Sequence, residues 1–232
     1  MKDKKILTLI LVNIFFLVAT IVTDILYIKL GNAYVYKTIA SATFVLCSLT
    51  NLILIKAFKY DHNKKFVLFL FLGQIFAFGG DILLIDYFVI GATSFAIGHI
   101  FYFISYCCLK PFKWLDLTFI GGAIAISMII IFATGINLGK NLPLIIGYAI
   151  VISFMLGKSA TLFMNDVKVG GIIFTGSLMF YLSDMFLMFR MFGGMSKIGS
   201  VLCLSFYYPA EFILASSIFT VYLVTKRRKT ND

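Results

Sequence analysis

Two aspartates lie in stretches where a carboxylate has no ordinary reason to be. Asp81 falls within the apolar run 66–85, and Asp184 falls within the apolar run 170–189. A bare acidic side chain near the centre of a membrane helix costs about 2.5 to 3.5 kcal/mol, so such residues usually face a polar cavity and take part in chemistry or transport there. We therefore treat Asp81 and Asp184 as a candidate catalytic pair.

Two carboxyl groups in one cavity of low dielectric constant cannot both ionise cheaply, so we expect one protonated acid and one carboxylate at neutral pH. Such a pair is suited to acid-catalysed cleavage at an acetal-like carbon. The acid protonates the substrate, the carboxylate stabilises an oxocarbenium ion, and one of the two guides water to it. The vinyl ether of a plasmalogen is a lipid bond of this kind. Which aspartate takes which role does not follow from the sequence.

Other polar residues recur at helical spacing and form stripes. Tyr181 precedes Asp184 by three residues, and His99 precedes Tyr102 by three, so each pair shares one helix face. Polar faces cannot favourably meet lipid, and we expect them to point into one central cavity. A single intramembrane histidine usually serves as a hydrogen-bonding group between helices, so a structural role for His99 stays open beside a functional one. The residues that we expect to bind or orient a substrate are Lys37, His99, Tyr102, Tyr181, Ser183, Arg190, Tyr207, Tyr208 and Glu211, with Lys37 and Arg190 placed to hold a phosphate.

The composition indicates a polytopic membrane protein. Of the 232 residues, 61% are hydrophobic and 13% are charged, which leaves too little polar surface to cover a soluble globule. Mean hydropathy is +1.02. Because the apolar runs are continuous and not alternating, we expect membrane helices and no barrel.

Apolar stretches between charged or turn-rich breaks predict an eight-helix transmembrane bundle, in a single domain over residues 1–232. The sixth stretch is short, and the third and fourth nearly fuse at Asp86 and Tyr87, so a seven-span interpretation follows if either of these helices fails. The eight predicted helices cover residues 6–28, 36–55, 66–85, 88–109, 115–133, 142–156, 170–189 and 198–224.

The basic residues predict the orientation. If the N-terminus is cytoplasmic, the inside segments hold fifteen Lys and Arg residues and the outside segments hold five. This bias supports eight spans with both termini in the cytoplasm. The net charge of +10 lies in short segments beside membrane ends, so we expect anionic lipid headgroups as partners and no nucleic acid. The Lys-, Ile- and Phe-rich composition suits a bacterial cytoplasmic membrane.

The sequence predicts neither a metal nor another cofactor. The chain has two histidines, and His62 falls in a predicted cytoplasmic segment far from His99, so one chain cannot form a three-histidine zinc site. The four cysteines fall within or at the end of predicted helices and indicate neither a disulfide framework nor a zinc cluster.

Four short motifs occur in order along the chain: GDILL at 80–84, FAIGHIFY at 95–102, GSLMFYLSD at 176–184 and YYPAE at 207–211. This succession resembles the YhhN family of lysoplasmalogenases over nearly the whole chain. The resemblance implies a hydrolase that cleaves the vinyl ether of lysoplasmalogen, a single-chain lysophospholipid, to a fatty aldehyde and glycerophosphocholine or glycerophosphoethanolamine, with Asp81 and Asp184 as the catalytic acids. The family's second helix usually opens with Lys-Pro, where this chain has Lys37 and Thr38. Its last motif often carries Gln where this chain has Glu211, which adds an acid to the cavity.

Two other classes use the same buried acids. In a proton-coupled transporter they would relay protons, and a membrane protein that only binds lipid would tolerate their loss. Against a transporter, the chain has only three prolines and no pair of Gly- or Pro-broken spans.

Overall fold

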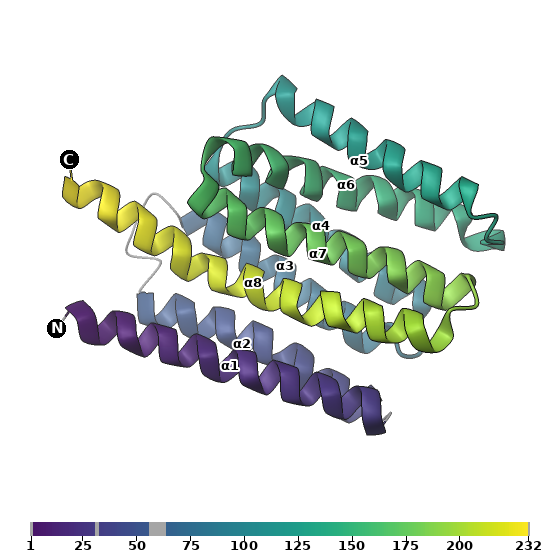
Figure 1. Ribbon diagram of the computed structural model, residues 1–232, viewed down its shortest axis with the longest axis horizontal. Coiled ribbons are helices and arrows are strands. Elements are labelled where there is room, and N and C mark those ends of the chain that lie inside the picture. The colour runs from purple at the N-terminus through teal and green to yellow at the C-terminus, as the bar shows by residue number, and fades with distance from the viewer. Residues whose placement is uncertain (1, 31–32, 56–63, 232) are drawn as a thin grey trace.

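The structure is a computed structural model that describes residues 2–30, 33–55 and 64–231. Within these residues the protein is a bundle of eight long helices without a strand, and the helices run side by side along one direction (Figure 1). They are α1 (Lys2–Leu30), α2 (Thr38–Ile55), α3 (Lys64–Leu83), α4 (Phe88–Leu109), α5 (Trp114–Ala133), α6 (Leu142–Asn165), α7 (Val167–Phe192) and α8 (Ser196–Asn231). A short π-helix, η1 (Ala33–Lys37), leads into α2, and a 3-10 turn, η4 (Gly139–Asn141), leads into α6.

All eight helices of the described residues are long and apolar enough to cross a membrane. The chain is therefore a multi-pass membrane protein, and the eight-span prediction is confirmed. The break between the third and fourth helices is a turn of hydrogen-bonded backbone, in which Leu84 N donates to Gly80 O at 2.8 Å and Tyr87 N donates to Leu83 O at 2.8 Å.

Helix α6 is longer than its apolar stretch indicates. The sequence predicts an end at residue 156 and places Lys158 in a connection, whereas the helix runs to Asn165 and Lys158 is only 2% exposed. Its Nζ lies 2.9 Å from Asp116 Oδ2 and donates to Pro111 O at 3.0 Å. Because the charge is paired, the lysine is accommodated inside the bundle and does not end the helix.

Helix α8 lies in the middle of the bundle. It packs against α7, α2, α1 and α3, while α1 and α2 form one edge and α5 forms the opposite edge beyond α6 (Figure 1). The two described chain ends lie at the same end of the bundle. The turns after α3, α5 and α7 lie at the other end, which we call the far end.

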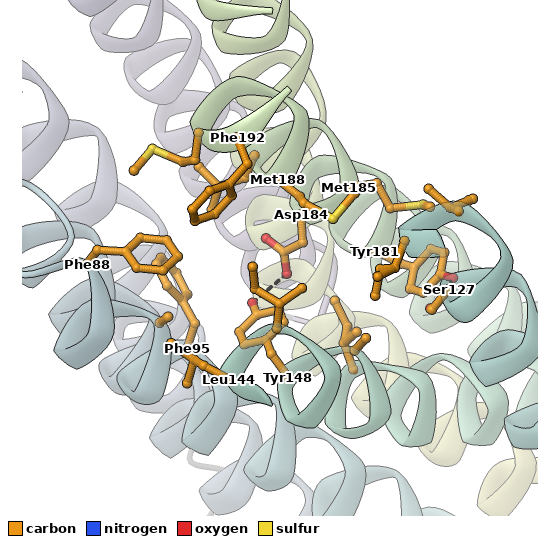
Figure 2. A pocket seen from close by; sticks show the side chains of 18 of the residues that line it. Phe88, Phe95, Ser127, Leu144, Tyr148, Tyr181, Asp184, Met185, Met188 and Phe192 are labelled. Carbon is orange, nitrogen blue, oxygen red and sulfur yellow. Dashed lines mark hydrogen bonds between the residues drawn. The ribbon is translucent and has the colours of Figure 1, made fainter. Parts of the chain in front are cut away.

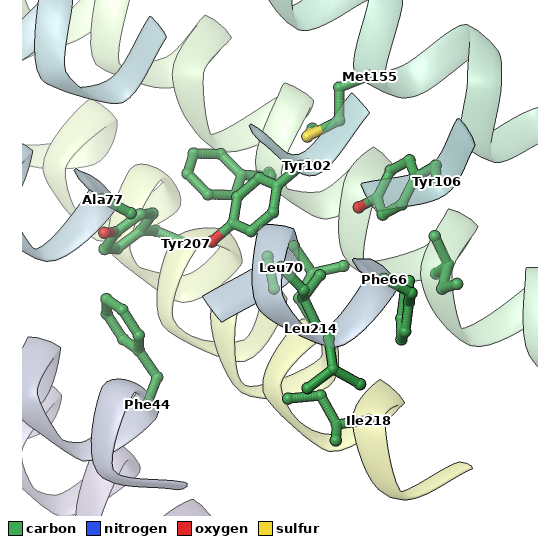
Figure 3. Packing of buried hydrophobic residues seen from close by; sticks show 14 of the residues in the cluster. Phe44, Phe66, Leu70, Ala77, Tyr102, Tyr106, Met155, Tyr207, Leu214 and Ile218 are labelled. Carbon is green, nitrogen blue, oxygen red and sulfur yellow. The ribbon is translucent and has the colours of Figure 1, made fainter. Parts of the chain in front are cut away.

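The interior is built largely from tyrosines, phenylalanines and leucines (Figure 3). Tyr102 reaches from α4 across α3 because Gly73 has no side chain there: a methyl group at Gly73 would lie 2.5 Å from the Tyr102 ring. A methyl group on Gly98 would likewise lie 3.0 Å from Gly73 O. The close contact of α3 with α4 lets a polar group on α4 meet residues on α8.

Candidate functional site

Asp81, near the end of α3, lies in a closed cluster of polar groups. It is 2% exposed, and its Oδ1 lies 3.2 Å from Lys37 Nζ, at the end of η1. Its Oδ2 accepts hydrogen bonds of 2.6 Å from Ser41 on α2 and from Tyr207 on α8. The Tyr208 hydroxyl approaches both Ser41 Oγ and Lys37 O at 3.5 Å. Asp81 is therefore a buried carboxylate with a cationic partner and a full set of donors.

Asp184, on α7, has a different environment. Its Oδ2 accepts a hydrogen bond from the Tyr148 hydroxyl at 2.6 Å and lies 3.2 Å from His99 Nε2, which itself lies 2.8 Å from the Tyr148 hydroxyl. No described group hydrogen-bonds to Asp184 Oδ1, and no described group hydrogen-bonds to the buried Nδ1 of His99. Asp184 is thus held at one oxygen while the other oxygen is available.

A cavity of about 90 Å³, enough for several water molecules, lies beside Asp184. Its walls come from α4, α5, α6 and α7, and in Figure 2 the Asp184 carboxylate points into it beside Tyr148. Among the described residues Asp184 is the only lining residue with a formal charge, and most of the others are Phe, Met, Leu and Ile. Asp81 does not line this cavity.

A third acid, Glu211 on α8, is fully buried. The Tyr102 hydroxyl lies 3.0 and 2.8 Å from its two carboxylate oxygens, and Gln74 Nε2 donates to its backbone O at 3.2 Å. Ser48 Oγ in turn donates to Gln74 Oε1. Within the described residues no cation pairs with Glu211, so this acid is held by neutral groups.

The two aspartates do not touch each other. No hydrogen bond or ion pair between described residues joins them, and aromatic rings lie between their partners. The Phe180 ring centroid lies 5.2 Å from that of Tyr207, which donates to Asp81, and 4.6 Å from that of His99, which contacts Asp184. The predicted polar faces do meet inside the bundle, but as separate clusters on the two sides of Phe180.

The remaining predicted residues lie around these clusters. Tyr181 lines the cavity, but its hydroxyl is turned toward α5, where it lies 2.6 Å from Ser127 Oγ and donates to Ala123 O at 3.2 Å. Ser183 Oγ donates to Cys203 O at 3.0 Å and so ties α7 to α8. Arg190 is half-buried near the far end of α7, where its backbone and Cβ lie against Gly199 of α8.

Sequence reasoning missed Ser41 and Tyr148. Ser41 follows Lys37 by four residues, which is the spacing of one helix face, although η1 changes the register between them. Tyr148 is the only tyrosine of α6 and lies next to Gly147 in an otherwise apolar stretch. The available signal for Tyr148 was a hydroxyl group in the apolar stretch that opens α6.

Comparison with protein-family models finds a match. The model of the YhhN family matches residues 33–218, from the start of η1 into α8. That range contains all three acids and every residue described above as their partner. No curated protein and no solved structure matches the chain.

Proposed function

This chain belongs to the YhhN family, and we propose that it is a membrane lysoplasmalogenase, which hydrolyses the vinyl ether of a lysoplasmalogen to a fatty aldehyde and glycerophosphocholine or glycerophosphoethanolamine. The observation that carries the proposal is the position of Asp184. Among the described residues it is the only acid on a largely apolar cavity, and a histidine and a tyrosine hold one of its oxygens. Apolar walls suit a lipid chain, and the free oxygen suits transfer of a proton.

In the proposed mechanism Asp184 Oδ1 gives a proton to the β-carbon of the vinyl ether. The double bond supplies the electron pair for the new C–H bond, and an oxocarbenium ion forms at C1, next to the Asp184 carboxylate. Water then adds to C1 and returns a proton to Asp184. The hemiacetal collapses to the aldehyde and the glycerol hydroxyl, so that one water is consumed and the acid is regenerated.

Asp81 has an indirect role in this proposal. Its carboxylate fixes the Tyr207 hydroxyl, and the Tyr207 ring packs on Phe180, which packs on His99. Asp81 is therefore a positioning residue that keeps His99 against Asp184. The Lys37 ammonium pairs with Asp81 inside the bundle and does not lie at the surface. It therefore stabilises the Asp81 carboxylate and is not placed to bind a headgroup.

The test is fatty-aldehyde release from lysoplasmenylcholine and lysoplasmenylethanolamine by the detergent-purified protein. We expect Asp184→Asn to abolish release, and Asp81→Asn to reduce it while some activity remains. Asp86→Asn is the matched control, because Asp86 is exposed in the turn after α3 and does not line the cavity beside Asp184. Ester lysolipids serve as the substrate control.

Aldehyde release that survives Asp184→Asn at the wild-type rate would contradict the mechanism. If folded wild-type protein releases no aldehyde from either lipid, the hydrolase proposal fails. Proton-coupled flux of lysolipid into liposomes then becomes the next measurement.

A further inference from the structure

An open groove of about 510 Å³ lies at the far end of the bundle. It is formed by Tyr87 and the start of α4, the turn η4, and the end of α7. Phe88, Met191 and Phe192 line both this groove and the cavity beside Asp184. The groove and the cavity are therefore neighbouring parts of one hollow.

An aromatic pair marks the junction. The ring centroids of Phe88 and Phe192 lie 5.4 Å apart in an edge-to-face arrangement. Figure 2 shows these two rings next to each other at one side of the cavity, with Asp184 further inside. A chain that passes between the groove and the cavity has to pass these rings.

Lys140 provides the charge of the groove. It is exposed in η4, and of the described residues that line the groove it alone has a formal charge. No described carboxylate forms an ion pair with it. The other lining residues are apolar or aromatic except Asn141, so the groove combines one cation with an apolar surface. This combination is complementary to an anionic headgroup on a hydrocarbon chain.

The separation between Lys140 and Asp184 fits such a ligand. Lys140 precedes Tyr148, the partner of Asp184, by eight residues, which corresponds to roughly 12 Å along a helix. The phosphorus and the vinyl carbons of a lysoplasmalogen are about seven bonds apart, or roughly 9 Å when extended. The flexible side chain of Lys140 can span the difference between these two lengths. A phosphate at Lys140 therefore puts the vinyl ether at the depth of Asp184.

We propose that the groove around Lys140 binds the phosphate of a single-chain lysophospholipid, whose chain runs past the Phe88–Phe192 pair into the Asp184 cavity. The inference rests on the proposed function, because it assigns the headgroup site for the same substrate. The cavity of about 90 Å³ beyond the two rings leaves room for part of one chain and not for two. We therefore expect this site to prefer a single-chain lipid to a diacyl phospholipid.

The kinetic test compares a lysoplasmalogen with a 1-alkenylglycerol, which has the vinyl ether but no phosphate. For Lys140→Met we expect the KM for the lysoplasmalogen to rise about fivefold to tenfold, because the variant loses one exposed charge-assisted contact with the phosphate. The kinetics for the alkenylglycerol should not change, and Lys140→Arg should restore the wild-type KM. The matched control is Lys197→Met. Lys197 is an exposed lysine at the same end of the bundle, and it lines neither the groove nor the cavity.

A binding test separates the headgroup site from the chemistry. Its probe is a 1-O-alkyl lysophosphocholine, which has no double bond to cleave, and its readout is the dissociation constant in detergent. We expect Lys140→Met to weaken binding of this probe about fivefold to tenfold and to leave binding of the matching 1-O-alkylglycerol unchanged. Inorganic phosphate should compete weakly, because it lacks the chain.

The outcomes are distinct. If the wild-type protein releases aldehyde but Lys140→Met leaves both KM and probe binding unchanged, the headgroup site is wrong and the hydrolase proposal stands. If the wild-type protein releases no aldehyde but Lys140→Met weakens probe binding, the site stands and the proposed reaction is wrong. Equal binding of a diacyl phosphocholine would overturn the assignment to a single-chain lipid.

Discussion

At the scale of single residues, two neighbouring side chains hold the Asp184 carboxylate in place. Tyr148 and His99 contact the same oxygen, Oδ2, and each other. A carboxyl group held at one oxygen keeps a fixed orientation, so the other oxygen can face a substrate throughout the reaction. Tyr148 is thus as much a part of the candidate site as the histidine.

We predict that Tyr148→Phe lowers aldehyde release by about tenfold to a hundredfold, the size expected for one hydrogen bond to a charged group. The phenyl ring keeps its contact with His99, so the fold should not change. The control is Tyr106→Phe, which removes a hydroxyl that lies 2.9 Å from Ser177 Oγ. Tyr106 does not line the cavity. Equal activity of Tyr148→Phe and Tyr106→Phe would remove Tyr148 from the mechanism.

The Lys37–Asp81 pair makes a prediction about stability. Lys37→Met leaves Asp81 buried without a cation, and we expect the free energy of unfolding to fall by about 3 to 5 kcal/mol. The double variant Lys37→Met/Asp81→Asn removes the unpaired charge and should recover part of this loss. Reversible unfolding in mixed micelles measures both. Wild-type stability in Lys37→Met would mean that Asp81 does not need its cation.

The sequence located the acids and most of the residues around them, but not which residue pairs with which acid. Asp81, Asp184, His99 and Glu211 were found because a polar residue in an apolar helix is conspicuous. That Lys37 pairs with Asp81 could not be predicted, because the π-helix η1 turns the lysine inward and hydropathy does not report such a local change of register. Which rings separate two acids likewise depends on how the helices are rotated and packed.

At the scale of helices, hydropathy predicted the number of spans and failed at the end of α6. A hydropathy sum treats Lys158 as a free charge, whereas Asp116 compensates it in the structure. Asp116 also accepts hydrogen bonds from Thr161 and from the backbone N of Lys113 at 2.6 Å. One acid therefore joins the start of α5 to the last turns of α6.

We predict that Lys158→Met lowers the free energy of unfolding by about 3 kcal/mol or more, because it leaves Asp116 buried without its cation. Activity per folded molecule should not change, because this pair lies at the opposite end of α5 and α6 from the cavity-lining residues of those helices. Unfolding and aldehyde release are measured on the same preparation. The control is Lys168→Met, at an exposed position near the start of α7.

At the scale of the whole molecule, the candidate site lies in the half of the bundle nearer the far end. The residues that line the cavity beside Asp184 and the groove at Lys140 lie in that half. The excess of Lys and Arg at the end that holds the termini favours a cytoplasmic location for that end. The substrate is then expected to reach the site from the extracytoplasmic leaflet.

Labelling with a membrane-impermeant maleimide tests this orientation in intact cells. The two reporters are Thr134→Cys, exposed at the far end, and Phe112→Cys, exposed between α4 and α5 at the end of the termini. The half-buried Cys107 and Cys108 are first replaced by serine. We expect only Thr134→Cys to react in intact cells, and both reporters to react after the membrane is permeabilised. Labelling of Phe112→Cys alone would reverse the orientation, and the hollow at Asp184 and Lys140 would then receive its lipid from the cytoplasmic leaflet.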